Sequence, residues 1–192
     1  MKIRHHVTQA GFTLVELMVA ISIIGILSAI VYANFGESRA SARDSIRKAD
    51  LKSLQIAIEL YKAQNGVYPL GCNGGTAGAT PTWSGNVQGS AACPGGSTEY
   101  IIGLVPDYIA ALPVDPRAGS YPLVGNYGYL YGASSDQKQY KIMAANVVEV
   151  QQVTSYNDEF ARCPQTGSAG CPAAEPPKSG YALYKGPVAA MW

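Results

Sequence analysis

An uninterrupted apolar segment near the N-terminus is the feature that most limits what this chain can fold into. Residues 12–35, FTLVELMVAISIIGILSAIVYANF, form a run of 24 residues whose one charge is Glu16. As a helix, the segment is about 36 Å long, which is enough to cross a hydrocarbon core of about 30 Å. Lys2 and Arg4 precede it without an acidic residue, which places the N-terminus in the cytoplasm. We therefore predict a single membrane span.

A cleaved secretory signal peptide is the alternative interpretation of this segment. It would require a small-residue cleavage site between Ser28 and Ala33. Two features favour the retained helix instead. The apolar run is about twice as long as an ordinary signal-peptide core, and Glu16 interrupts it near its start.

The helix is predicted to continue beyond the apolar run. Apolar residues then recur at spacings of three and four, at Leu51, Leu54, Ile58 and Tyr61. The charged residues between Arg43 and Glu59 are expected to occupy the remaining surface. No proline occurs before Asn65, and Asn65-Gly66 followed by Pro69 is a good stop signal. We predict one helix over residues 12–65, about 54 residues long, of which only the second half packs on a soluble domain.

The rest of the chain predicts a small antiparallel sheet, so the fold class is α+β. Residues 127–130 and 140–144 alternate in polarity around a turn at 132–138, which is typical of a β-hairpin. A third strand is expected at 146–153, and a short turn-and-helix stretch at 100–118. The tail from Cys163 to Trp192 has no firm prediction.

Four cysteines lie C-terminal to the apolar segment, at Cys72, Cys93, Cys163 and Cys171. An even number in Gly- and Pro-rich loops, with no C-x-x-C spacing, favours two disulfides over metal ligands, with reduced structural thiols as the alternative. Three pairings are open. The local one, Cys72 with Cys93 and Cys163 with Cys171, is favoured because each pair brackets a turn-rich stretch. We therefore expect this part of the chain to lie outside the cytoplasm.

The string GFTLVE at Gly11–Glu16, with a short basic leader before it and LMVAISIIGILSAI after it, resembles the N-terminus of type IV prepilins and type II secretion pseudopilins. Further matches in family order are Ala49–Pro69, LPVDP at Leu112–Pro116, Tyr127, Tyr129 and YKIMA at Tyr140–Ala144. The resemblance implies a type IV pilin-like fold. Its parts are a leader peptide (1–11), a transmembrane and assembly helix (12–35), an amphipathic helix (36–66), and a β-sheet with variable loops (67–192).

The resemblance also implies how the subunit is processed and assembled. A prepilin peptidase is expected to cut between Gly11 and Phe12 and to methylate the new amine of Phe12. Glu16 is then expected to pair with the positive N-terminus of a neighbouring subunit; the alternative is that it sits in the headgroup zone, partly neutralised by the helix dipole. Gly25 matches a glycine where the family's helix loosens in the filament. Ala33 replaces a proline that many members have, which weakens that expectation.

Cleavage at this position would change the chemistry of the chain. It removes His5 and His6, the only histidines, so histidine-based catalysis and histidine-ligated metals are excluded from the mature chain. Loss of Lys2 and Arg4 leaves 12 basic residues against 13 acidic ones, a net charge of −1. A near-neutral chain does not indicate nucleic-acid binding. We expect a structural protein and not an enzyme.

Two filament functions are open. A structural subunit of a type IV pilus is favoured, because the Cys72–Cys93 and Cys163–Cys171 regions enlarge the exposed surface. The alternative is a type II secretion pseudopilin in a periplasmic pseudopilus. In both, the precursor sits in the bacterial inner membrane, and its partners are further copies of itself, the prepilin peptidase and the inner-membrane assembly platform. The pilus would then be an extracellular filament.

Two ligand-binding roles are weaker predictions. Major pseudopilins bind calcium in the loop after LPxDP, where Asp115 and Asp136 are the candidates here. The chain lacks the paired aspartates expected there, so ordinary turn aspartates, and no metal or cofactor, are predicted. The 13 tyrosines with Trp83 and Trp192 could bind carbohydrate or DNA, but we expect strand and interface residues.

Overall fold

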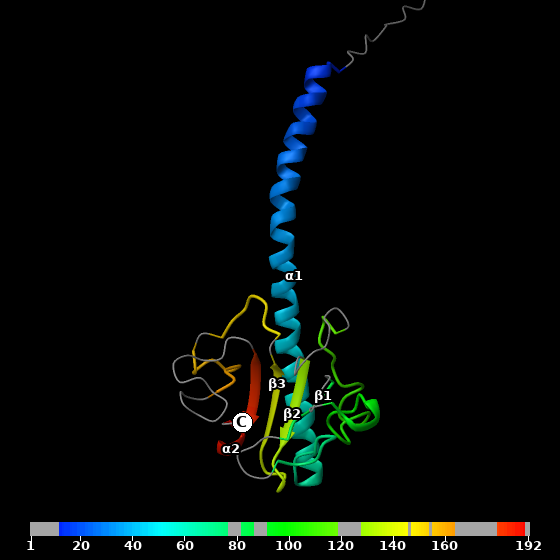
Figure 1. The fold of residues 1–192 in the computed structure, drawn as a ribbon, viewed down its shortest axis with the longest axis vertical. Helices are drawn as coiled ribbons and strands as arrows, with labels where there is room; N and C mark the ends of the chain where they lie inside the picture. The colour runs from blue at the N-terminus through cyan, green and yellow to red at the C-terminus, as the bar shows by residue number, and fades with distance from the viewer. Residues whose placement is uncertain are drawn as a thin grey trace, which may run out of the picture. The chain divides into compact units, whose positions relative to one another are not determined.

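The computed structural model describes residues 12–76, 82–86, 92–118, 128–145, 147–153, 155–163 and 180–190. The chain divides after Arg39 into two units, residues 1–39 and residues 40–192. The elements in chain order are helix α1 (Leu14–Asn65), strand β1 (Ser84–Gly85), the 3-10 turn η1 (Pro94–Gly96), strands β2 (Gly128–Ala133), β3 (Tyr140–Ala145) and β4 (Tyr181–Lys185), and helix α2 (Pro187–Ala190) (Figure 1).

Helix α1 confirms the long helix predicted from the sequence. It is 52 residues long, begins two residues later than expected, and ends at Asn65. Gly66 adopts a positive φ of 79°, which a residue with a side chain rarely tolerates, and its amide donates to Lys62 O at 2.8 Å. The helix therefore stops because a glycine follows it.

The sheet is antiparallel throughout, in the order β1-β2-β3-β4. Strands β2 and β3 form the predicted hairpin, with Gly128 opposite Ala145 and Ala133 opposite Tyr140. Tyr127, where the first strand was expected to begin, lies outside the described residues. The turn starts later than predicted because the Ser134 hydroxyl accepts from the amides of Lys138 and Gln139, which closes the loop beyond Ala133.

Two predictions for the second half of the chain are wrong, and one strand lies where no structure was predicted. Residues 147–153 do not form a strand, since the amides of Glu149, Val150 and Gln151 donate to the Asp44 carboxylate and not to a neighbouring strand. The strand that pairs with β3 is β4, from the tail for which no structure was predicted. Residues 100–118 form turns without a helix.

One face of the sheet packs on α1 and forms the main core of residues 40–192. The predicted helix positions Leu51, Leu54 and Ile58 are fully buried there. The sheet contributes mainly tyrosines, whose hydroxyls are satisfied: Tyr129 donates to Asp50 at 2.6 Å, Tyr140 to Glu59 at 3.1 Å, Tyr131 to Pro69 O at 2.7 Å and Tyr181 to Gln151 O at 2.6 Å. These four tyrosines lie on strands, as expected, but they are buried in the core.

A buried charge cluster connects α1 to two loops and corrects the expectation that the helix charges lie on the surface. Arg47 is 1% exposed and donates to both oxygens of Asp115, at 2.7 and 3.0 Å, and to Asp44 at 2.8 Å. It also donates to Glu149 at 2.9 Å, and Arg43 forms a second ion pair with Glu149. The cluster, defined as Arg43, Asp44, Arg47, Asp115 and Glu149, therefore holds the 115 and 149 loops against the helix.

The charge cluster predicts a loss of stability in acid. Hydrogen bonds from Arg43 and then Arg47 lower the pKa of Glu149 to about 2, against an ordinary value of 4.5. Because the folded-state pKa is the lower one, this stabilisation is complete above about pH 4.5 and is lost as the pH falls towards 2. Glu149→Gln should lower the free energy of unfolding at pH 7 by a few kcal/mol, on the order of 3. Urea unfolding at several pH values between 7 and 3 measures this effect. The difference in the free energy of unfolding between the Glu149→Gln variant and the unsubstituted chain should decrease as the pH falls. A difference that does not change with pH would contradict the lowered pKa of Glu149.

A disulfide joins Cys72 to Cys93 across 21 residues, which confirms the local pairing for the first pair. Cys163 is buried and disulfide-bonded, and its predicted partner, Cys171, lies outside the described residues. In the chain-entropy model, a disulfide that closes a loop of the length between Cys72 and Cys93 stabilises the fold by about 3 kcal/mol. The Cys72→Ser/Cys93→Ser double variant should therefore unfold at lower urea concentration. Measurement of both chains under reducing conditions is the control: the variant and the unsubstituted chain should then unfold at the same urea concentration, because neither has the Cys72–Cys93 bond.

Candidate assembly site

The N-terminal half of α1 is apolar and exposed. Phe12 is 92% exposed, and the large apolar side chains from Leu14 to Ile30 that are described are all more than half exposed. Among the described residues, α1 is the helix that is long and apolar enough to cross a membrane. Such a surface is stable only when lipid or another protein covers it.

The start of α1 is fixed by Thr13 and Glu16. The backbone amide and the hydroxyl of Thr13 both donate to Glu16 Oε2 at 2.9 Å, and the amide of Glu16 donates back to the Thr13 hydroxyl at 3.2 Å. This reciprocal arrangement is a capping box, which satisfies amides that the first helical turn leaves unpaired. Thr13 was missed as a site residue, although the T-x-x-E spacing is the sequence signature of this box.

The capping box leaves part of the Glu16 carboxylate available. The hydrogen bonds that the Glu16 carboxylate accepts from the described residues go to Oε2. Both Thr13 and Glu16 are exposed. A carboxylate oxygen held in a fixed position at the helix start can therefore accept a bond from a second cationic group without breaking the cap.

The structure describes only one of the two residues of the predicted cleavage site. Phe12 precedes the helix and is exposed, whereas Gly11 lies outside the described residues. Cleavage and methylation at Phe12 stay predictions.

Gly25 lies inside continuous helix. A Cβ built at Gly25 or at Gly36 would have no atom within 4 Å, so neither glycine is required by close packing in the single chain. The predicted loosening of the helix at Gly25 would have to arise in the assembled state, and it stays a prediction.

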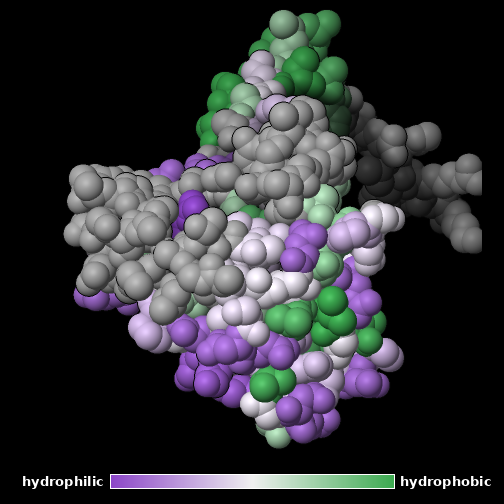
Figure 2. Space-filling view, turned by 60° about the horizontal axis from the view of Figure 1, so that its bottom comes forward, coloured by the Kyte–Doolittle hydropathy of each residue, from purple (hydrophilic) through white to green (hydrophobic). Residues whose placement is uncertain are grey.

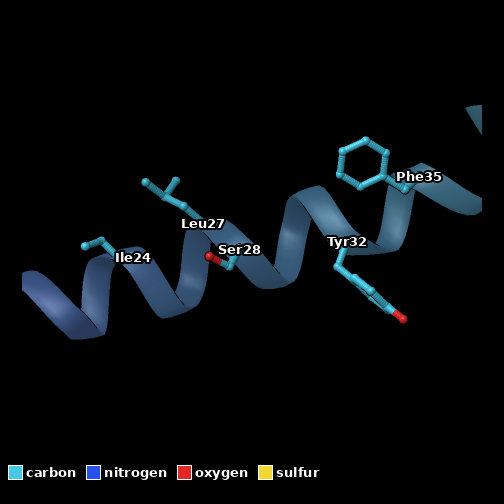
Figure 3. Close-up of a pocket in the computed structure, with 5 residues that line it drawn as sticks. All are labelled: Ile24, Leu27, Ser28, Tyr32 and Phe35. Atoms are coloured by element: carbon cyan, nitrogen blue, oxygen red, sulfur yellow. The ribbon is translucent and has the colours of Figure 1, made fainter.

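A shallow apolar groove runs along the next turns of the helix. Its lining residues are Ile24, Leu27, Ser28, Tyr32 and Phe35 (Figure 3). Ile24, Leu27 and Phe35 extend to one side of the ribbon and Tyr32 to the other in this view. The groove holds no charged group, so it suits an apolar side chain or a lipid tail and not a polar ligand.

Removing the Thr13 hydroxyl tests the capping box. Thr13→Val should weaken the helix start by about 1 kcal/mol, because the hydroxyl accepts from the Glu16 amide and helps to orient the carboxylate. If the chain assembles as the resemblance implies, we expect fewer subunits in the isolated filament fraction, measured by immunoblot, with leader cleavage unchanged by mass spectrometry. Thr13→Ser keeps the hydroxyl and should behave like the unsubstituted chain. Equal behaviour of the valine and serine variants would contradict a role for the cap.

The two aspartates that were considered as calcium ligands, Asp115 and Asp136, are bound by groups of the protein itself. Both oxygens of Asp115 are bound by Arg47, and one also accepts from the Arg117 amide at 2.8 Å. Asp136 lies in the β2–β3 turn, where it accepts from the Ser134 hydroxyl at 2.6 Å. Within the described ranges, no group of three or more His, Cys, Asp or Glu residues is placed to hold a metal. A guanidinium thus occupies the position next to Asp115 where a cation would have to bind.

The sequence is similar to a known family motif and to several characterised proteins. Residues 7–32 match the family model described as "Prokaryotic N-terminal methylation motif". A type II secretion system core protein G of Pseudomonas aeruginosa is 31% identical over 135 residues, which cover 68% of this chain and 87% of the relative.

Further relatives carry the same name. The Klebsiella michiganensis protein is 33% identical over 132 residues, covering 68% of this chain and 84% of the relative. The Escherichia coli protein is 31% identical over 126 residues, covering 62% and 76%. No solved structure matches the chain.

Proposed function

This chain belongs to the family of type IV pilins and type II secretion pseudopilins, and we propose that it is a pseudopilin, a structural subunit of a type II secretion pseudopilus. The observation that carries the proposal is the similarity to type II secretion system core protein G, which extends well beyond the N-terminal motif. The sequence alone favoured a surface pilus. The relatives support the alternative better, because the Pseudomonas, Klebsiella and Escherichia proteins are all named for type II secretion.

Assembly is proposed to proceed through the helix start. Cleavage after Gly11 creates a positive amine on Phe12, and Glu16 supplies a negative charge one helical turn away. A carboxylate at the centre of a bilayer costs about 2.5–3.5 kcal/mol even on lenient scales, so an unpaired Glu16 is unfavourable there. Pairing of this carboxylate with the amine of a neighbouring copy removes that cost. Repetition of one such offset contact between identical chains produces an open helical polymer.

The capping box gives this contact a defined geometry. Glu16 Oε2 is bound by Thr13, at 2.9 Å from both the amide nitrogen and the hydroxyl oxygen, so the carboxylate has little rotational freedom. Its other oxygen is proposed to accept from the neighbour's methylated amine. Preorganisation of this kind reduces the entropy lost on assembly.

The location follows from the same proposal. The precursor is anchored in the inner membrane by the apolar half of α1, and the mature subunit forms a periplasmic pseudopilus. Its partners are further copies of the chain, the prepilin peptidase and the inner-membrane assembly platform.

Deletion of the gene in its own bacterium tests the proposal. We expect proteins that normally reach the medium to accumulate in the periplasm, while surface pili stay unchanged in electron micrographs. Complementation with the unsubstituted gene should restore secretion. Normal secretion together with lost surface pili would instead establish a type IV pilus subunit.

Mass spectrometry of the mature chain tests the processing step separately. We expect it to begin with methylated Phe12. A chain that begins near Asn34 would show that the apolar segment is a cleaved signal peptide, and would remove the assembly helix altogether.

A further inference from the structure

Strand β1 lies at the edge of the sheet, within the loop that the Cys72–Cys93 disulfide closes (Figure 1). It is two residues long, with Ser84 opposite Tyr131 and Gly85 opposite Leu130 of β2. So short a ladder holds a strand weakly, because each backbone hydrogen bond adds only about 0.5–1.5 kcal/mol net. The position of β1 therefore depends on contacts outside the ladder.

The residues on either side of Cys72 provide the first of these contacts. The amide of Asn73 donates to Ser84 Oγ at 2.9 Å, and its side-chain amide donates to Trp83 O at 2.9 Å. Gly71 lies so close to the same serine that a Cβ built on it would be 2.3 Å from Ser84 Oγ and 2.7 Å from Ser84 Cβ. The chain around Cys72 thus packs directly on β1.

The residue before Cys93 contacts β1 from the other end of the loop. Ala92 forms a parallel bridge with Gly85, and its carbonyl accepts from the Asn73 side chain at 3.2 Å. Cys93 itself is buried in the main core. The disulfide therefore joins two segments that each contact β1, and it keeps both of them in place.

Trp83 connects β1 to a second apolar cluster. Side chains alternate along a strand, so this cluster lies on the face of the sheet opposite to the one that packs on α1. A Cβ built on Gly132 would be 3.4 Å from the Trp83 ring, so the indole lies against β2. The cluster that Trp83 packs on is no more than 3% exposed and consists of Leu130, Met143, Ala145 and Ala182.

We propose that the Cys72–Cys93 bond is a redox-controlled latch for the edge of the sheet. In the disulfide form, β1 and Trp83 are held on β2. In the dithiol form, both detach, which leaves the edge of β2 unpaired and the second cluster without its tryptophan. Bond formation removes two electrons and two protons from the two thiols, and a disulfide-bearing oxidoreductase accepts them as its own disulfide opens to two thiols. The inference concerns the single chain and does not depend on the proposed role in secretion.

The open form has a surface that the closed form lacks. An unpaired strand edge beside apolar residues pairs readily with other chains. The closed domain offers little of this kind in the lower part of Figure 2, where the surface is largely hydrophilic with separate small hydrophobic patches. Thiols stay reduced in the cytoplasm and are oxidised outside it. The latch therefore closes only after the domain has crossed the membrane.

The fluorescence of Trp83 tests the latch in the full-length chain in detergent. Trp192→Phe leaves Trp83 as the only tryptophan. In that background, Cys72→Ser/Cys93→Ser should shift the emission to longer wavelength and make quenching by acrylamide severalfold stronger, because the indole moves from an apolar cluster into water. An emission spectrum and quenching equal to those of the disulfide-bonded chain would overturn the inference.

Hydrogen exchange distinguishes a local opening from a general loss of stability. The Tyr129 amide donates to Asn86 Oδ1, directly after β1, at 3.2 Å, whereas the Ala182 amide donates to Phe160 O at 3.1 Å, away from β1. In the cysteine variant, the Tyr129 amide should exchange on the order of 100-fold faster. The Ala182 amide should exchange at its original rate. Equal acceleration at both amides would overturn the latch.

A glycine substitution opens the latch while the disulfide stays in place. Gly71→Ala places a Cβ where Ser84 lies, so it should produce the same emission shift as the cysteine variant, with the Cys72–Cys93 bond intact by mass spectrometry. Gly36→Ala is the matched control, because a Cβ there has no atom within 4 Å, and its spectrum should not change. Unchanged emission from the Gly71 variant would contradict the contact that holds β1.

Discussion

Glu16→Gln should abolish incorporation of the subunit into filaments while leaving the leader cleavage intact. Glutamine keeps the geometry of the capping box, since it can still accept from the Thr13 amide. What it lacks is the negative charge that pairs with the neighbour's amine. Leaving a desolvated cation without its partner typically costs about 2–5 kcal/mol per contact, and the contact is repeated at every subunit of the polymer. Immunoblots of the filament fraction sedimented from the periplasm and of whole cells would measure incorporation and expression.

A second glutamate on the same helix provides the control. Glu37 is exposed on α1, and Glu37→Gln removes the same charge outside the proposed contact. That variant should assemble like the unsubstituted chain. Normal filaments from Glu16→Gln would refute the pairing role, and equal loss in both variants would point to a general effect of helix charge.

Arg47→Leu should destabilise residues 40–192 more than Glu149→Gln does. Arg47 is 1% exposed, and its removal leaves Asp44 and Asp115 buried without their cation. Breaking a buried ion pair in this way costs about 3–5 kcal/mol, because the remaining charges lose their partner but stay out of water. For a chain of this size, a loss of that magnitude lowers the melting temperature by roughly 10 °C. Circular dichroism of the full chain in detergent would measure the change.

Arg39→Leu is the matched control for the Arg47 variant. Arg39 lies on the same helix and is exposed, so its loss should change the stability by no more than about 0.5 kcal/mol.

A calcium titration adds an independent test of the charge cluster. Because Arg47 already neutralises Asp115, calcium should leave the melting temperature of the unsubstituted chain unchanged. A clear calcium-dependent increase would contradict this account of the 115 loop.

Local signals in the sequence predicted the helix and the hairpin well. No proline occurs before Asn65, and the Asn65-Gly66 pair is a stop signal, so the sequence predicted the last residue of α1 correctly. A glycine at positive φ ends a helix by its own geometry. Alternating residues predicted the β2–β3 hairpin, because neighbouring strands joined by a short turn need no distant information. The T-x-x-E signature of the cap was also present in the sequence and was overlooked.

The errors have a common cause in distant contacts. Residues 147–153 have the composition of a strand, but the Asp44 carboxylate, over a hundred positions earlier, binds their amides. Strand β4 lies in a Pro-rich tail, and only the free edge of β3 selects it as a strand. A local sequence pattern cannot predict such contacts, because whether a segment forms a strand depends on the neighbouring strand as much as on its own residues.

The apolar run of residues 12–35 by itself predicted a helix that is long and apolar enough to span a membrane, since length and hydrophobicity alone set that requirement. Only the tertiary structure decided how the second half of that helix is used. The sequence placed its charges on the outer surface, whereas the fold buries Asp44 and Arg47 and binds the others to nearby loops and tyrosines. A charged side chain orients towards the groups that form ion pairs or hydrogen bonds with it, and for this helix those groups belong to residues far away in the chain.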